Sequence, residues 1–167
     1  PYFAMYLSIR EYAAVRLDAV GGAVAAQRSH GAWFARMGDD AAIDALYRQG
    51  GESRRVALAL DIENLVAACR RAVPRGDAAI AVPAFVGAAE VFDVQGPATA
   101  GVLLGTSVVA MPGMSDRQRA AASATMGRMT FRAGHVEEAA RWYGDAVDLA
   151  RRAGDERQEL AAARHQP

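Results

Sequence analysis

Apolar residues recur at steps of three and four along most of this chain, the spacing that predicts amphipathic helices. The stretch from Ala120 to Gly154 shows the pattern best and reads as two antiparallel helices joined by a short turn at Gly134–His135. Small residues stand where two such helices must touch, and aromatic residues stand where the hairpin needs filling; these are Gly127, Ala139 and Ala146, and Phe131, Trp142 and Tyr143. One hairpin cannot bury its apolar face alone, so the rest of the chain should supply neighbouring helices.

The N-terminal part is predicted to open with an arm and a helix. Residues 2–7 are rich in aromatic side chains and form either a short strand or an extended arm. Ser8 and Glu11 have the spacing of a capping box, which places the start of the first helix at Ser8. Gly21–Gly22 then ends that helix.

Breaks in the periodic pattern separate further predicted helices up to residue 77. In the helix over 23–37, Trp33 and Phe34 are the bulky core candidates. Asp77 can cap the helix that begins after it. The elements expected here are a helix over 23–37, a short helix capped by Asp39–Asp40 and running through Tyr47, a loop over 49–53, and a helix from about 54 to 73 that bends near Asp61.

The most apolar region spans Ala78 to Met111, where the only charges are Glu90 and Asp93. From Val94 to Ser115 there is no charge at all, a length that raises the question of a membrane span. A Gly–Pro pair and a Pro–Gly pair bracket only a short helix within it, and small and polar residues dilute that helix. We therefore expect a buried helical hairpin, in which Pro83 is tolerated near the start of the first helix.

Capping boxes mark the starts of the last predicted helices, and the apolar hairpin repeats residue types of the clear hairpin. Ser115 with Gln118 is a capping box that opens the clear hairpin, and Asp155 with Gln158 opens a last helix to about Arg164. The positions that echo Gly127, Ala139, Tyr143 and Ala146 at an offset of 39 to 40 residues are Gly87, Ala100, Leu104 and Ser107. The chain is predicted to be all-α, with eight or nine helices in stacked antiparallel pairs.

The clear hairpin resembles a tetratricopeptide repeat, a two-helix unit of about 34 residues. Met126–Gly127 takes the place of that family's Leu–Gly pair, and Ala139, Tyr143 and Ala146 match its series of small, aromatic and small residues. The resemblance implies a helical solenoid packed through these five positions.

In tetratricopeptide arrays the first helix of each pair lines the concave surface, so the resemblance also implies a binding face. Arg128 and Arg132 are four residues apart and could hold a carboxylate or phosphate, or they could simply form a solvated face. The family's carboxylate clamp uses Asn residues that this helix lacks, since Asn64 is the only Asn in the chain. The candidate partner-binding residues are Ala121, Ala124, Arg128, Phe131 and Arg132.

The opening of the chain resembles a segment of large bacterial signal-transduction ATPases of the STAND class. The run Tyr6 to Ala13 matches their Thr-Ile/Val-Arg-Glu-Tyr-Ala segment, Ser29 to Phe34 a His-Ala-Ala-Trp/Tyr motif, and Leu60 to Ala68 a later Leu-Asp-x-Glu-x-Asn segment. The resemblance implies an arm and linker helix over 1–22 that follow an upstream domain, and a helical-repeat domain over 23–167. Its parts would be degenerate repeats over 23–114, the clear repeat over 115–153 and a terminal helix over 155–165.

Composition narrows the chemistry. The formal net charge is zero, which disfavours a general nucleic-acid binder. All 19 basic residues are Arg, so the chain can carry neither a Walker A lysine nor a Schiff-base lysine. The lone Cys69 lies in an apparent helix and reads as a small buried hydrophobe.

Histidines and paired carboxylates also read as structural. His30, His135 and His165 have no partner at metal-site spacing, so we expect His30 to pack or hydrogen-bond, His135 to cap a helix, and His165 to lie in a tail. The pairs Asp39–Asp40 and Glu137–Glu138 both stand at predicted helix starts, where negative charge suits the helix dipole. We expect no catalytic residue, metal or cofactor in this part of the protein.

The leading hypothesis is a non-catalytic protein–protein interaction or sensor module of a cytoplasmic bacterial signalling or transcriptional regulator. Its partner would be a protein or peptide, with no direct nucleic-acid binding and no membrane. One alternative is a freestanding scaffold that self-associates, for example as a homodimer. A second is a helical bundle in which the apolar hairpin over 78–111 lines a small-ligand pocket.

Overall fold

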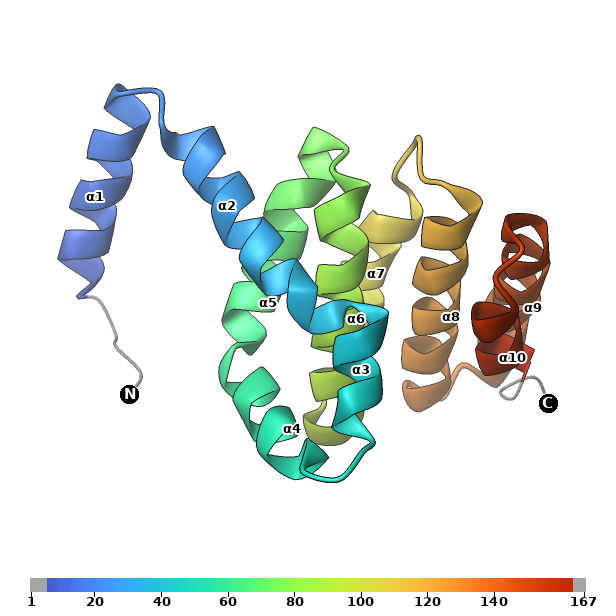
Figure 1. Ribbon diagram of the computed structural model, residues 1–167. Coiled ribbons are helices and arrows are strands. Elements are labelled where there is room, and N and C mark those ends of the chain that lie inside the picture. The colour runs from blue at the N-terminus through green and yellow to red at the C-terminus, as the bar shows by residue number, and fades with distance from the viewer. Residues whose placement is uncertain (1–5, 164–167) are drawn as a thin grey trace.

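The computed structural model describes residues 6–163, which fold into ten α-helices and two short 3₁₀ turns without a strand (Figure 1). The all-α prediction is confirmed. The helices are α1 (Leu7–Ala19), α2 (Ala23–Ala35), α3 (Asp40–Leu46), α4 (Gly51–Leu60), α5 (Ile62–Ala72), α6 (Ala78–Gln95), α7 (Ala98–Val109), α8 (Asp116–Arg132), α9 (Val136–Ala153) and α10 (Glu156–Ala163). The turns are η1 (Arg36–Gly38) and η2 (Val73–Arg75).

The N-terminal half holds more helices than predicted. The helix expected over 54–73 is two helices, because Asp61 ends α4 and begins α5 with backbone angles outside the helical region. The loop expected over 49–53 is also wrong, since α4 already begins at Gly51. A Cβ at Gly51 would lie 2.1 Å from the carbonyl oxygen of Leu46, so glycine is what lets α4 start directly after α3.

Neighbouring helices pack side by side from α5 to α10. Helix α6 lies against α5, α7 and α8, and α9 packs against α8 and α10. Helix α1 stands apart from this body and contacts α2 (Figure 1). The stacking of antiparallel pairs into a tetratricopeptide-like solenoid stays a prediction.

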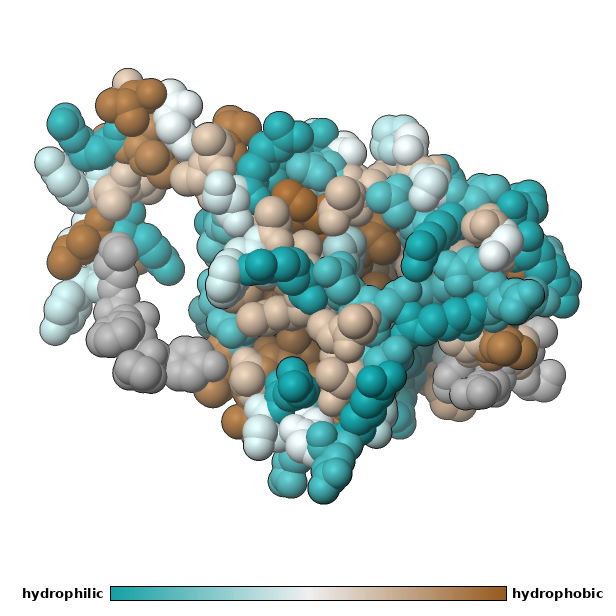
Figure 2. Space-filling view, viewed as in Figure 1, coloured by the Kyte–Doolittle hydropathy of each residue, from teal (hydrophilic) through white to brown (hydrophobic). Residues whose placement is uncertain are grey.

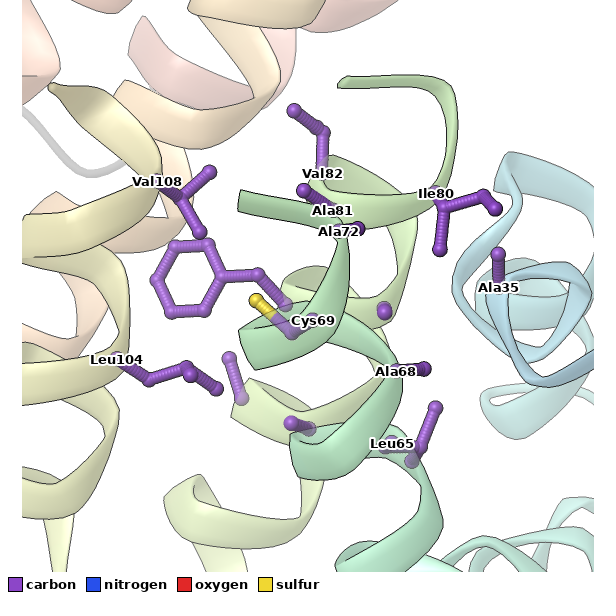
Figure 3. Packing of buried hydrophobic residues seen from close by; sticks show 14 of the residues in the cluster. Ala35, Leu65, Ala68, Cys69, Ala72, Ile80, Ala81, Val82, Leu104 and Val108 are labelled. Carbon is purple, nitrogen blue, oxygen red and sulfur yellow. The ribbon is translucent and has the colours of Figure 1, made fainter. Parts of the chain in front are cut away.

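The main core lies where α5, α6 and α7 meet. Leu104 and Val108 of α7 point toward Cys69 of α5, and all three side chains are buried (Figure 3). Burial raises the pKa of the Cys69 thiol to about 12, against a small opposing effect of Arg70. The prediction that Cys69 is a small buried hydrophobe is confirmed.

The two hairpins pack a large side chain against a glycine, but in opposite senses. In the α8–α9 pair the first helix supplies the glycine: a Cβ at Gly127 would lie 3.0 Å from the ring of Tyr143. In the α6–α7 pair the second helix supplies it: a Cβ at Gly105 would lie 2.5 Å from Cζ of Phe85. Gly87 and Ser107 therefore do not share the packing of Gly127 and Ala146, which they echo in sequence: Gly87 faces Leu65 and Gly38, and Ser107 is exposed.

The apolar hairpin is part of the core. Helix α6 is long and apolar enough to cross a membrane by length and composition, but 61% of it is buried inside the protein. Pro83 lies within α6 without ending it, as predicted. A core helix passes the same test of length and composition, and the burial of α6 agrees with the expected buried hairpin.

Several predicted caps and core positions can be compared with the structure. The capping box of Ser115 and Gln118 is present, and Gln118 N donates to Ser115 Oγ over 3.2 Å. Asp155 caps α10 by accepting from the Gln158 backbone N–H over 3.1 Å. The Ser8 capping box is wrong, because α1 begins at Leu7 without a side-chain cap.

Trp33 is not a core residue. It is 58% exposed, and Arg36 stacks over its ring at 4.0 Å from the centroid. Phe34 is partly buried and packs against the core. The arm predicted over residues 2–7 lies mostly outside the described residues.

Candidate functional site

A groove of about 610 Å³ runs between α3, α6, α8 and α10. Helix α6 contributes Val82, Pro83 and Val86, and α8 contributes Ala121 and Ala124, so the walls are apolar and made of small side chains. A band of hydrophilic residues reaches from α3 toward α8 and α10 on the same face of the molecule (Figure 2). The groove therefore has apolar walls and a charged rim.

The floor of the groove holds a three-residue network centred on Glu90. This carboxylate is 8% exposed; it accepts a hydrogen bond from Tyr47 Oη on Oε2 over 2.6 Å, and Arg128 Nη1 donates to its Oε1. Burial opposes the positive charge of Arg128, but the attraction and hydrogen bond of Glu90 outweigh it and raise the pKa of the guanidinium. Arg128 therefore stays charged where it contacts Glu90.

Tyr47 completes this network from the end of α3, where it is the C-cap residue. The residue is 67% exposed, yet its hydroxyl points inward to Glu90. Desolvation of the hydroxyl and the neighbouring carboxylate raise the pKa of Tyr47 to about 12. Tyr47 therefore stays a neutral hydrogen-bond donor throughout the physiological pH range.

The rim of the groove is a network of charges that joins α3 to α10. Arg157 donates to Asp40 over 2.7 Å and to Asp44 over 2.5 Å. Arg117 of α8 reaches Asp40 and Asp155, both over 3.1 Å. Helices α3 and α10, more than 110 residues apart in sequence, are thus connected across one end of the groove.

The structure places the five candidate partner-binding residues in three different settings. Ala121, Ala124 and Arg128 line the groove. Arg132 forms two hydrogen bonds to Asp93, over 2.6 and 3.2 Å, and these raise the pKa of its guanidinium. Phe131 is half exposed and does not line the groove. The five positions expected to pack the repeat are buried: Met126, Gly127, Ala139, Tyr143 and Ala146.

Sequence reasoning missed the contributions of Tyr47, Glu90 and the α3–α10 rim. A signal for Glu90 did exist, because it is one of two charges in the most apolar stretch of the chain. A buried carboxylate needs a cationic partner, and Arg128 lies in α8, the first helix of the next hairpin along the chain. Nothing in the local pattern of α3 or α10 indicated that these helices meet.

The remaining polar candidates differ in whether they form the contacts that the sequence predicted. His30 lies 3.4 Å from Asn64 Oδ1 through Nε2 and packs against Phe34, in line with its predicted role. The expected caps at Asp39, Asp77 and His135 are wrong as side-chain caps, because all three occupy N-cap positions without a side-chain cap bond. Asp77 pairs with Arg28 instead. His165 lies outside the described residues. Within residues 6–163, no group of three His, Cys, Asp or Glu side chains is placed to hold a metal ion.

The fold and the groove define an all-α protein in which a hollow face of packed helices forms the most developed candidate binding site. No protein-family model, curated protein or solved structure matches this chain.

Proposed function

We propose that this chain is a non-catalytic interaction module that binds a segment of a partner protein in the groove between α3, α6, α8 and α10. The observation that carries the proposal is the groove itself. Its volume of about 610 Å³ is that of a small-ligand pocket, enough for a few side chains of a bound segment. Its walls are apolar, and its charged side chains stand on the floor and the rim, where they can fix the orientation of a bound segment.

The sequence resemblance to STAND-class ATPases adds a context to this proposal. In such a regulator, a segment bound in the groove would bias an ATPase located upstream through a coupling free energy of about 1–3 kcal/mol. A full-length regulator whose ATP hydrolysis does not respond to any groove-binding partner would contradict this context while leaving the binding function intact.

The direct test is selection of binders from a random 12-residue peptide library on the purified protein. Ala79 is an exposed groove-lining residue of α6, so Ala79→Trp should fill the groove without disturbing the core. Ala25→Trp, at an exposed position of α2 outside the groove, is the matched control. We expect selected peptides to lose binding to Ala79→Trp only. A selection that enriches nothing, or enriches peptides equally for Ala79→Trp, would contradict the proposed function.

A second candidate function, self-association, is favoured by α1. All of its described residues are exposed, among them Leu7, Ile9, Tyr12 and Val15, and hydrophobic residues of this helix face solvent (Figure 2). An isolated helix of 13 residues is marginal in water, so α1 gains most if another copy of the chain covers it. The small-ligand alternative for the hairpin over 78–111 is less well supported, because Phe85 fills the space between α6 and α7.

A further inference from the structure

We infer that the groove accepts an uncharged, apolar peptide segment of the partner and rejects acidic ones, and that Glu90 is the residue that sets this preference. The inference rests on the proposed function and adds the chemistry of the bound segment. It also differs from the sequence-based expectation that Arg128 and Arg132 could hold a carboxylate or phosphate.

The charged side chains that line the groove balance one another. Three acidic and three basic side chains line it, namely Asp39, Asp40, Glu90, Arg117, Arg128 and Arg157. Each of the three basic side chains already pairs with a carboxylate of the same chain. Arg132, just beyond the groove, is paired with Asp93 in the same way. No arginine of the groove thus offers an uncompensated positive charge to an anionic ligand.

Arg128 is held in place by its bond to Glu90. Its side chain is 22% exposed, and the bond from Nη1 to Glu90 fixes the plane of the guanidinium against the floor. The same side chain lines the groove, so its guanidinium borders the space that a bound segment would occupy. Arg128 therefore offers oriented N–H donors while Glu90 cancels its net charge.

A neutral carbonyl oxygen and a carboxylate differ in the electrostatic energy of binding to Arg128, because Glu90 lies beside it. A neutral carbonyl can accept an N–H bond from Arg128 without approaching another full charge unfavourably. A carboxylate in the same place would lie on the far side of the guanidinium from Glu90, close enough for like-charge repulsion in a poorly hydrated site. It would also lose its own hydration on entry. The floor therefore suits a peptide carbonyl or a side-chain amide.

The walls of the groove suit small apolar side chains. Val82, Pro83 and Val86 face Ala121 and Ala124 across the groove, surfaces that favour small or β-branched apolar side chains. Pro83 has no N–H to donate to the carbonyl of Ala79, which leaves a backbone acceptor at the wall. These groups match an extended peptide, which carries carbonyls, N–H groups and apolar side chains in alternation.

The test compares peptide pools selected on three proteins. Glu90→Gln removes the charge behind Arg128 and keeps a hydrogen-bond acceptor for it. Asp93→Asn releases Arg132 in the same way on the same pair of helices, but outside the groove, and serves as the matched control. We expect the wild-type pool to be apolar and depleted of Asp and Glu. The Glu90→Gln pool should gain one acidic position, and a peptide carrying Glu there should bind Glu90→Gln about tenfold more tightly than wild type.

The outcomes separate this inference from the proposed function. A wild-type pool rich in Asp or Glu, or an Asp93→Asn pool that gains the same acidic position, would overturn the inference and leave peptide binding in place. No enriched pool would overturn the proposed function. A second measurement needs only the wild-type protein and so applies even if Glu90→Gln does not fold. The affinity of a peptide selected on wild type should change less than about twofold between 50 and 500 mM salt. A steep loss of affinity with salt would indicate recognition by charge and overturn the inference.

Discussion

The carboxylate of Glu90 on α6 pairs with the guanidinium of Arg128 on α8 across 38 residues of sequence, and both side chains are largely buried. The pair joins the first helices of two successive hairpins at the floor of the groove. Arg132 and Asp93 join the same two helices further along, but with an exposed arginine. The two pairs thus link the same helices with different degrees of burial, which makes their energetic roles separable.

The first prediction uses this difference. Arg128→Ala leaves the buried Glu90 without its cation and should lower the free energy of unfolding by about 3 kcal/mol. Arg132→Ala breaks the more exposed pair and should cost less than about 1 kcal/mol. Urea denaturation of both variants measures the difference. Equal losses in the free energy of unfolding would mean that burial does not increase the contribution of the Glu90–Arg128 pair to stability.

The sequence predicted well what depends on neighbours along the chain. The α8–α9 hairpin and the Ser115 capping box rest on contacts between residues close in sequence, and both are present. Periodicity was a poorer guide to which stripe of a helix faces the body, so Trp33 was expected in the core and is exposed. The groove was out of reach, because its rim depends on the meeting of Asp40 and Arg157, which are 117 residues apart.

Cys69 gives a prediction for alkaline pH. Its thiol has an ordinary pKa of 9.0, and burial in the folded protein raises it to about 12. The unfolded chain therefore loses this proton first as the pH rises, so the thiol's contribution to stability is complete below pH 9 and is lost between pH 9 and 12.

Unfolding of wild type and Cys69→Ala across this range isolates the thiol. The wild-type protein should lose stability relative to the variant by on the order of 1 kcal/mol per pH unit. Tyrosine and arginine titration affects both proteins alike and cancels in the difference. If the free energies of unfolding of the two proteins fall in parallel from pH 9 to 12, the pKa of the thiol is not raised by burial and the prediction is wrong.

Phe85 and Gly105 give a prediction about packing. A methyl group at Gly105 would lie 2.5 Å from Phe85 Cζ and 2.8 Å from Met126 Sδ, so Gly105→Ala should be destabilising by about 1–3 kcal/mol despite the better helix propensity of Ala. Phe85→Leu should restore part of this loss by making room. The double variant should therefore lose less free energy of unfolding than the two single variants lose together. A loss equal to their sum would contradict the proposed contact.

Arg157 gives a prediction about local opening. The described ion pairs between α3 and α10 run through this side chain, whereas Arg152 pairs with Asp116 between α9 and α8. Because exposed ion pairs contribute little to global stability, both Arg157→Ala and Arg152→Ala should unfold within about 1 kcal/mol of wild type. Only Arg157→Ala should speed amide hydrogen exchange in α10, and high salt should have the same effect on the wild-type protein. Unchanged exchange in α10 would show that its contacts with α8 and α9 hold it without Arg157.

Helix α1 gives a prediction about assembly. Tyr12 and Val15 lie on a helix that packs against α2, and both are about two-thirds exposed. If a second copy covers this helix, the mass measured by light scattering should rise with concentration from 17.7 kDa toward twice that value. Tyr12→Glu places a charge in the shared apolar surface and should keep the protein monomeric, while Glu52→Gln on α4 should not. A wild-type mass that stays constant over a hundredfold concentration range would rule out self-association through α1 and leave the groove as the site where a partner is to be sought.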